Sequence, residues 1–377
     1  MLHFSAEEYA DRLARAEAEM SARGLDGMLV FCPDNLYWLT GYDDGGGSGI
    51  ERCLVLGGTE PVLLAPPEAI AQARMTSVIE DVRASATPFA HLRDILAECS
   101  LTGRRIGIET ETRGLTGQAY ARLLAALDGR VTLYEASDLF PDLRRVLSET
   151  ELVYMRRAAE LADEAFEAAC EIAGAGTSEG EVLAAMQARM LLAGGDLPAM
   201  PPLVGSGDHA HLSRPHAGRR VLAARDLLCL EWSGAYRHYL AAMMRSVVIG
   251  PVDDRTGRMH DAAVAVLEAA EAELRPGRTM GAVFDAYAKT MDKTGFGDCR
   301  LDACGTALGA RLAPGQAPGD AIAQGARTTL RAGMTLYLRV VLVDPAQGTS
   351  MMLGRSSTLT DGRAQPLSRL ALDLVPI

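Results

Sequence analysis

Glu231 is the residue of this 377-residue chain whose setting most clearly suggests chemistry. It follows the apolar run Leu227–Leu230, so a strand would deliver its carboxylate into a largely apolar surround, where the charge needs a cation or a hydrogen-bond donor. A carboxylate in such a surround is a candidate functional group. The alternative is a structural ion pair of Glu231 with Arg245 or Arg339.

His216 is the second candidate, because an imidazole changes charge near neutral pH and can therefore transfer a proton. The alternative is a local hydrogen bond within its proline-containing loop. Asp208, His209 and His211 have the residue types of a metal site, but a polar loop is the commoner explanation for such a group.

The segment after Glu231 offers further candidates for ligand binding. His238 and Tyr239 are neighbours on an expected strand, so their side chains should point to opposite faces and only one can face a pocket. Arg245 could bind a substrate, or it could form an ion pair or stacking contact within the sheet.

The composition argues against several classes of partner. The net charge is −12, and no run of Lys or Arg could neutralise a nucleic-acid backbone. No apolar stretch reaches the roughly 18 residues that cross a bilayer, and the first residues do not resemble a signal peptide, so we expect a cytoplasmic protein. Seven scattered cysteines without C-x-x-C spacing predict reduced, mostly buried thiols.

Two domains are expected, and residues 1–140 should form the first, an α/β domain. A helical pattern over Glu7–Arg23 ends at Gly24 and is followed by short apolar runs typical of buried strands. The expected strands are Gly27–Cys32, Cys53–Leu56, Pro61–Ala65, Ile106–Glu109 and Val131–Tyr134.

Residues 141–377 should form the second domain, after a linker at Phe140–Asp142. Gly176–Val182 and Gly277–Val283 each combine a Gly turn, a Ser or Thr cap and a following helix, which suggests a duplicated half. Each half adds strands, so we predict an antiparallel sheet with pseudo-twofold symmetry, backed by helices. The expected strands are Leu227–Trp232, Arg245–Ile249, Met334–Val343 and Ser356–Thr360.

Four segments of the chain carry a resemblance to a known superfamily: Pro33–Tyr42, Ser148–Ala159, Pro215–Ala217 and Glu231–Gly250. They resemble the creatinase/aminopeptidase P/methionine aminopeptidase ("pita-bread") superfamily, and the last is most similar to the metal-free creatinase-like and ectoine hydrolase-like branch. The resemblance implies a creatinase-like α/β domain, then a pita-bread domain with a curved antiparallel sheet, and a homodimer.

The peptidases of that superfamily bind two metal ions through two Asp, one His and two Glu. The resemblance places these positions on Glu231, Ala242, Thr306, Arg339 and, depending on a one-residue gap, Gly354 or Arg355. A guanidinium in place of a carboxylate repels divalent cations, so we expect no metal and no other cofactor.

The resemblance also implies roles for the candidates. His216 matches a pocket histidine used for proton transfer, Glu231 matches a proposed nucleophile of ectoine hydrolases, and Tyr239 and Arg245 match superfamily features of the strand pair. Arg339, and Arg355 if it points inward, would favour a carboxylate-bearing ligand.

The function expected is metal-independent hydrolysis of a C–N bond in a small carboxylated amide, amidine or guanidino compound. The alternatives are a catalytically silent protein that binds a small molecule or peptide and, less favoured, an Xaa-Pro metallopeptidase. Creatine and ectoine themselves are poor candidates, because Met244 replaces a creatine-binding carboxylate and Asp43–Gly49 lacks the aromatic groups that the resembling ectoine hydrolases carry there.

Overall fold

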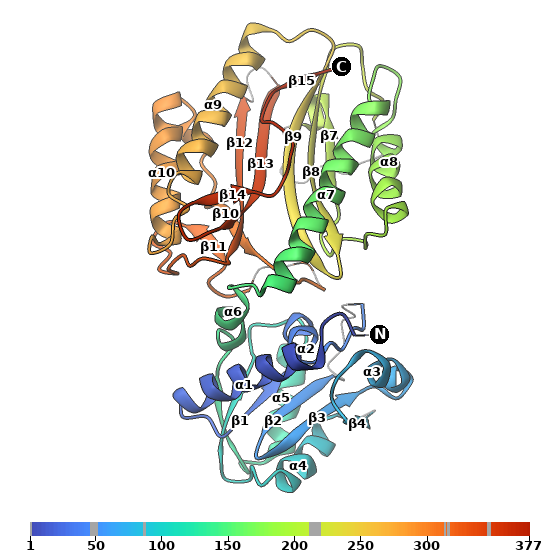
Figure 1. The fold of residues 1–377 in the computed structure, drawn as a ribbon, viewed down its shortest axis with the longest axis vertical. Helices are drawn as coiled ribbons and strands as arrows, with labels where there is room; N and C mark the ends of the chain where they lie inside the picture. Colours follow the sequence, from blue (N-terminus) through green and yellow to red (C-terminus); the bar gives the residue numbers. More distant parts are fainter. Residues whose placement is uncertain are drawn as a thin grey trace. The chain divides into compact units, whose positions relative to one another are not determined.

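A computed structural model describes residues 2–45, 52–85, 88–210, 220–312, 314, 317–344 and 348–377 (Figure 1). The chain divides into two compact units, Met1–Arg144 with Leu312–Pro318 and Arg145–Arg311 with Gly319–Ile377. The sequence predicts a boundary at residues 140 and 141, four residues earlier, and carries no signal that a segment from the second half of the chain belongs to the first unit.

The first unit is built on a six-stranded mixed sheet in the order β4-β3-β2-β1-β5-β6. The pairs β1–β2 and β2–β3 are antiparallel, and the other three pairs are parallel. Five of the strands correspond to predicted strands, and β4 is additional. The elements are α1 (Ala6–Ala22), β1 (Gly27–Val30), α2 (Pro33–Thr40), β2 (Cys53–Gly57), β3 (Thr59–Ala65), the 3-10 helix η1 (Pro67–Ala69), α3 (Ile70–Thr76), β4 (Asp81–Ala84), α4 (Pro88–Glu98), β5 (Arg105–Ile108), α5 (Gly117–Leu127), β6 (Thr132–Glu135) and α6 (Leu139–Arg144).

The predicted linker at Phe140–Asp142 is wrong, because these residues lie inside α6. Leu139 and Phe140 are fully buried and pack into the core of the first unit, so hydrophobic burial keeps this segment within the unit.

The second unit is built on a nine-stranded sheet whose main order is β11-β10-β12-β13-β9-β8-β7, with β14 paired to β13 and β15 to β9. The predicted strands correspond to β8, β9, β12 and β13; β8, β9 and β13 are longer than expected, and β12 has the expected length, displaced by one residue. The elements are α7 (Glu149–Ile172), α8 (Glu179–Leu192), β7 (Leu203–Ser206), η2 (Gly207–His209), β8 (Asp226–Tyr236), β9 (Tyr239–Ile249), α9 (Asp254–Glu271), α10 (Met280–Thr294), η3 (Gly297–Cys299), β10 (Ala303–Leu308), β11 (Ala321–Ala323), β12 (Thr335–Asp344), β13 (Thr349–Leu359), β14 (Ala364–Pro366) and β15 (Val375–Pro376).

The two halves of this unit share a plan of two helices followed by strands, as the repeated Gly and Ser or Thr pattern predicts, and β11 has no counterpart among the described residues of the first half. Ser178 caps α8 and Thr279 caps α10, and each cap residue also forms a β-bridge, to Val221 and Thr329 respectively. The helices α7 to α10 lie on one face of the sheet (Figure 1). The side chains that alternate toward the other face are therefore not covered by these four helices.

Helix α7 lies directly against β8. The Trp232 indole donates a hydrogen bond to the carbonyl of Ala162 at 2.9 Å and stacks on Phe166. A Cβ atom on Gly234 would lie 1.9 Å from the carbonyl oxygen of Ala158, so only glycine permits this approach. These contacts fix the helix-facing residues of β8, and Glu231 alternates to the opposite face.

The seam between β9 and β13 joins the two halves, and it relies on side chains. Met244 and Gly354 form the one residue pair of the described ladder between these strands. Arg245 donates from Nη1 to the carbonyls of both residues, at 2.9 and 2.7 Å. The Ser246 hydroxyl accepts from the backbone N–H of Met352 at 2.8 Å, and the Ser356 hydroxyl donates to a carbonyl of β9.

The seam yields a stability prediction. Ser246→Ala should lower the free energy of unfolding by about 1–3 kcal/mol, because the buried backbone N–H of Met352 loses its acceptor. The matched control is Ser357→Ala, which removes a buried hydroxyl that finds no hydrogen-bond partner among the described residues and should cost little. Urea unfolding of the two variants checks this, and equal losses of stability would contradict it.

Candidate functional site

Four residues form one row across the face of the nine-stranded sheet that points away from α7 to α10. Glu231 pairs with Met244, Met244 with Gly354, and Gly354 with Arg339. Residues directly opposite one another point to the same side of a sheet, so the four positions share a face. The outer two are three strand spacings apart, about 14 Å in a flat sheet, so their side chains must reach inward to meet.

Glu231 and Arg339 do meet. The Arg339 Nη1 atom lies 3.3 Å from Oε1 of Glu231, and the hydroxyl of Tyr337 donates to the same oxygen at 3.2 Å. The side chains of Glu231 and Arg339 are 22% and 37% exposed, so a ligand from solvent can reach both. Burial, followed by the negative charge of Glu231, raises the pKa of Tyr337 well above its usual value, so the phenol stays protonated and remains a donor.

The surface around this pair is apolar. Ala242, Met244 and Met352 are each at most 8% exposed and pack with Tyr337 and Cys229 in one hydrophobic cluster. Such a floor lowers the effective dielectric constant beside the Glu231–Arg339 pair and strengthens electrostatic contacts with a bound ligand.

Arg355 is not part of this site, which corrects the expectation that it points inward. It makes two hydrogen bonds, of 2.7 and 2.6 Å, to the carboxylate of Glu271 on α9, on the helix side of the sheet. Gly354, which pairs with Arg339, lies in the row that contains Glu231, and Arg355 alternates to the other face.

Arg245 also points to the helix side, so its expected contact with substrate is not supported. The side chain is 2% exposed and binds the seam carbonyls described above. Burial and the nearby charge of Arg355 lower the pKa of Arg245 to about 10. The contact spans two strands of the sheet, but it consists of hydrogen bonds to carbonyls and not of the expected ion pair or stacking contact.

Tyr239 and His238 lie apart from the pair. The Tyr239 hydroxyl donates to Glu151 of α7 at 2.6 Å, and the ring is fully buried. His238 is not on a strand, contrary to the prediction, because the turn between β8 and β9 consists of Arg237 and His238, both with positive φ. Neither residue joins Glu231 and Arg339.

His216 and His211 lie outside the described residues, so the expected role of His216 stays a prediction. Within the described ranges, no group of three or more His, Cys, Asp or Glu side chains could hold a metal ion.

The residues that the resemblance places at metal positions do not fit a pair of divalent cations. Glu231, Ala242, Thr306, Arg339 and Gly354 lie on five strands of one sheet, and only Glu231 offers a carboxylate. That carboxylate is bound by a guanidinium, which supplies the positive charge that a cation would bring.

Tyr337 is a site residue that the sequence argument missed. It lies two residues before Arg339 on β12, so both side chains share a face, and the alternation of the strand was the available signal.

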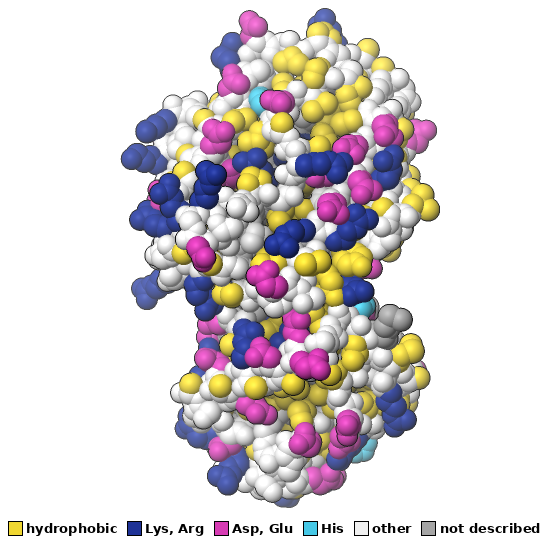
Figure 2. Space-filling model, in the orientation of Figure 1, with side chains coloured by type: hydrophobic (Ala, Val, Ile, Leu, Met, Phe, Trp, Pro, Cys, Tyr) yellow, Lys and Arg dark blue, Asp and Glu magenta, His cyan; other side chains and the backbone are white. Residues whose placement is uncertain are grey.

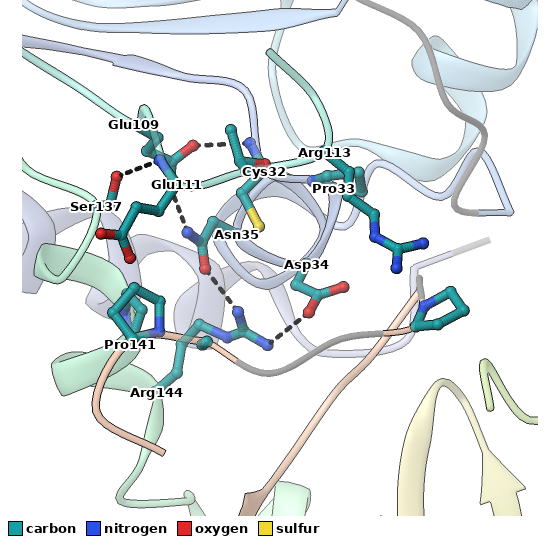
Figure 3. Close-up of a pocket in the computed structure, with 14 residues that line it drawn as sticks. Cys32, Pro33, Asp34, Asn35, Glu109, Glu111, Arg113, Ser137, Pro141 and Arg144 are labelled. Atoms are coloured by element: carbon teal, nitrogen blue, oxygen red, sulfur yellow. Dashed lines mark hydrogen bonds and ion pairs between the residues drawn. The ribbon is translucent and has the colours of Figure 1, made fainter. Parts of the chain in front are cut away.

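The first unit contains a separate cavity of about 110 Å³ (Figure 3). Its buried carboxylate, Glu109, accepts from the Asn35 amide, and Asn35 in turn accepts from Arg144, which lies 3.9 Å from Asp34. Burial is the main reason why the pKa of Glu109 is raised. Because these polar groups satisfy one another, we interpret the network as structural.

The surface charges on the face seen in Figure 2 alternate in sign. Lys and Arg side chains are interspersed with Asp and Glu, and no continuous basic stripe crosses this face. Among the described residues, no helix has both the length and the apolar character to span a bilayer.

Comparisons with known proteins identify the family. The model of metallopeptidase family M24 matches residues 153–357, and that of the creatinase/prolidase N-terminal domain matches residues 12–146. The chain is 27% identical over 339 residues to an ectoine hydrolase from Halomonas elongata, covering 83% of each chain. It is 22% identical over 368 residues to a Xaa-Pro dipeptidase from Pyrococcus furiosus, covering 97% of this chain and 99% of the relative.

Among solved structures, a prolidase from Thermococcus sibiricus superposes with a TM-score of 0.87 at 20% identity, covering 99% of this chain and 100% of that one. This likeness confirms the predicted fold class, a creatinase-like α/β domain followed by a pita-bread domain. The family matches and the shared fold together show that the chain belongs to metallopeptidase family M24, within the creatinase/aminopeptidase P superfamily.

Proposed function

We propose that this protein hydrolyses a C–N bond in a small carboxylated amide, amidine or guanidino compound, without a divalent metal ion. The observation that carries the proposal is the contact between Glu231 and Arg339 at the centre of the sheet, where the family's metal ligands would converge. A carboxylate that is half-buried, fixed by two donors and reachable from solvent has the properties of a catalytic group.

Arg339 would bind the carboxylate of the substrate. A guanidinium has five N–H donors, and the described contact with Glu231 uses only Nη1. The remaining donors can grip a planar carboxylate in a bidentate manner, and the apolar floor formed by Met244 and Met352 would take the carbon skeleton.

Glu231 would act on the carbon of the C–N bond, either directly as a nucleophile or by activating a water molecule. As a nucleophile, Glu231 would form a bond to the carbon while the C–N bond breaks, and water would then cleave that new bond and release the free carboxylate. As a base, it would take a proton from the water that attacks the carbon, and the C–N bond would break in the same route. In both routes the leaving nitrogen receives a proton. We assign that proton transfer to His216, on the strength of its position in the Pro215–Ala217 motif.

A protein that binds a ligand without turning it over is the second candidate. It is supported by the ion pair between Glu231 and Arg339, which neutralises the charge of Glu231 within the chain. A structural ion pair of this kind requires no catalytic role. A ligand that stabilises the protein but is recovered unchanged would favour this alternative.

The first prediction concerns activity. We expect the wild-type protein to release ammonia or an amine from at least one member of a panel of small carboxylated amides, cyclic amidines and guanidino compounds, in the presence of excess chelator. Glu231→Gln should lower kcat by at least about 100-fold, because a neutral amide can neither attack nor accept a proton. His216→Ala should cause a loss of about the same order.

The matched controls are Glu268→Gln, at an exposed position of α9, and His209→Ala on η2, which should leave activity within about twofold. Mass spectrometry of the products identifies the bond that is cleaved. Activity that appears only after manganese or cobalt is added would refute the proposal, as would full activity in Glu231→Gln.

The second prediction concerns metal binding. A ligand that binds only the native state at 100 times its Kd stabilises a protein by about 2.7 kcal/mol, so a resident metal site would raise the Tm on addition of manganese. The Arg339 guanidinium already supplies the positive charge that a metal ion would bring to Glu231. We therefore expect 1 mM MnCl₂, compared with excess chelator, to leave the Tm of the wild type within about 1 °C. A rise of several degrees that disappears in Glu231→Gln would contradict this.

A further inference from the structure

We propose that Tyr337 is a positioning residue of this site: its ring fills the space above Gly354, and its hydroxyl and Arg339 together hold Oε1 of Glu231 so that Oε2 faces the ligand. This inference rests on the proposed function in one respect, which is that Glu231 is the group that reacts.

The first step of the argument is steric. A Cβ atom added to Gly354 would lie 3.0 Å from Cε2 and 3.1 Å from the hydroxyl oxygen of Tyr337, so the ring passes over this glycine. Tyr337 pairs with Ser356, one row away from Gly354, and therefore reaches it along a diagonal of the sheet. Position 354 needs no side chain here because the phenol of Tyr337 occupies that volume.

The second step concerns hydrogen bonding. Tyr337 and Arg339 both donate to Oε1 of Glu231, and no contact of Oε2 with another described residue accompanies them. Two donors on one oxygen fix the rotation of the carboxylate more tightly than one donor does, and the second oxygen is left with its acceptor capacity. Oε2 is thus the atom available to a ligand or to a water molecule.

The third step concerns the state of the phenol. The charged groups that act on Tyr337 are Glu231 on β8, Arg339 on β12 and Arg245 on β9, from the far side of the sheet. Burial and Glu231 dominate and keep the hydroxyl protonated at physiological pH. A protonated phenol beside a carboxylate is a dependable donor, so the arrangement holds across the range in which enzymes usually work.

The test uses the full-length protein with carbon-13 at the Cζ atom of its tyrosines, observed by NMR. Tyr337→Phe assigns the resonance of Tyr337. In Glu231→Gln that resonance should move at neutral pH, and its ionisation should begin at lower pH than in the wild type, because a negative neighbour and a charged acceptor are lost. An unchanged resonance with unchanged ionisation would overturn the proposed contact.

Gly354→Ala probes the steric step in the same experiment. The new methyl group meets the ring and also the carbonyl of Leu338 at 2.7 Å, so the Tyr337 resonance should shift whether or not stability falls. If the resonance of Tyr337 stays in place in a folded Gly354→Ala protein, the ring does not lie over Gly354 and the inference fails.

Kinetics on a hydrolysed panel compound separates positioning from binding. Tyr337→Phe should lower kcat by about 10- to 100-fold with KM within about twofold, because the carboxylate loses its orientation while Arg339 still holds the substrate. The matched control is Tyr120→Phe on α5 of the first unit, which should change neither parameter. A rise in KM at constant kcat would show that Tyr337 binds substrate and would refute the positioning role.

The two proposals can fail separately. If Glu231→Gln retains activity while the Tyr337 resonance responds to it, the contact stands and the catalytic role of Glu231 is wrong. If Glu231→Gln is inactive and the resonance of Tyr337 does not respond, the catalytic role stands and the positioning role is wrong. The NMR measurement needs no substrate, so it decides the contact even when no panel compound is hydrolysed.

Discussion

The second unit depends on one seam, where its two halves meet between β9 and β13. The ladder there is short, and a guanidinium carries much of the connection: Arg245 bonds the carbonyls of Met244 and Gly354 from the helix side. Burial lowers the pKa of Arg245 to about 10, which means that keeping it charged costs free energy. Two of its nitrogens, Nε and Nη2, find no hydrogen-bond partner among the described residues. The fold retains this costly group at Met244 and Gly354, the one residue pair of the described ladder between the two strands.

The seam also sets the geometry of the candidate site, because Glu231 belongs to one half of the sheet and Arg339 to the other. A buried or half-buried carboxylate must be compensated, and a protein can supply the compensation as metal ions or as its own cations. Here Arg339 compensates the charge of Glu231. Arg355 lies on the opposite face of the sheet, where it forms an ion pair with Glu271. In the part of the chain that the structure describes, the site therefore pairs one guanidinium with one carboxylate, which leaves donors of Arg339 available for an anionic ligand.

Much of the fold follows from local patterns in the sequence. The Ser and Thr caps of α8 and α10 predict the duplicated half, and the apolar run before Glu231 predicts β8. Both predictions succeed because helix capping and strand alternation are local properties of the sequence. The linker at Phe140–Asp142 could not be recognised as helix α6, because its burial depends on residues distant in sequence. His238 was mistaken for a strand residue, since nothing in its neighbours demands the positive φ of a two-residue turn.

The site was predictable only in part, for a related reason. Glu231 and Arg339 could be named, because family resemblance fixes their positions along the chain. Arg355 could not be placed, because a shift of one residue exchanges the two faces of a strand, and only the observed register with β12 resolves it. To recognise Tyr337 as a site residue, one must also know that position 354, on the neighbouring strand, has no side chain where the tyrosine ring lies. That relation joins two strands and cannot be seen in either one alone.

Gly354 contributes both to the seam between the two halves and to the candidate site. On one face its carbonyl accepts the Arg245 hydrogen bond that joins the halves, and on the other its missing side chain admits the ring of Tyr337. A larger residue would press on Tyr337 and on the carbonyl of Leu338 at once, and so would disturb the pairing of β12 with β13 together with the position of the Glu231 carboxylate. A longer side chain at this position, a carboxylate included, is therefore incompatible with Tyr337 as it stands. Position 354 can carry a side chain, or the ring of Tyr337 can lie over it, but the packing of these strands does not admit both.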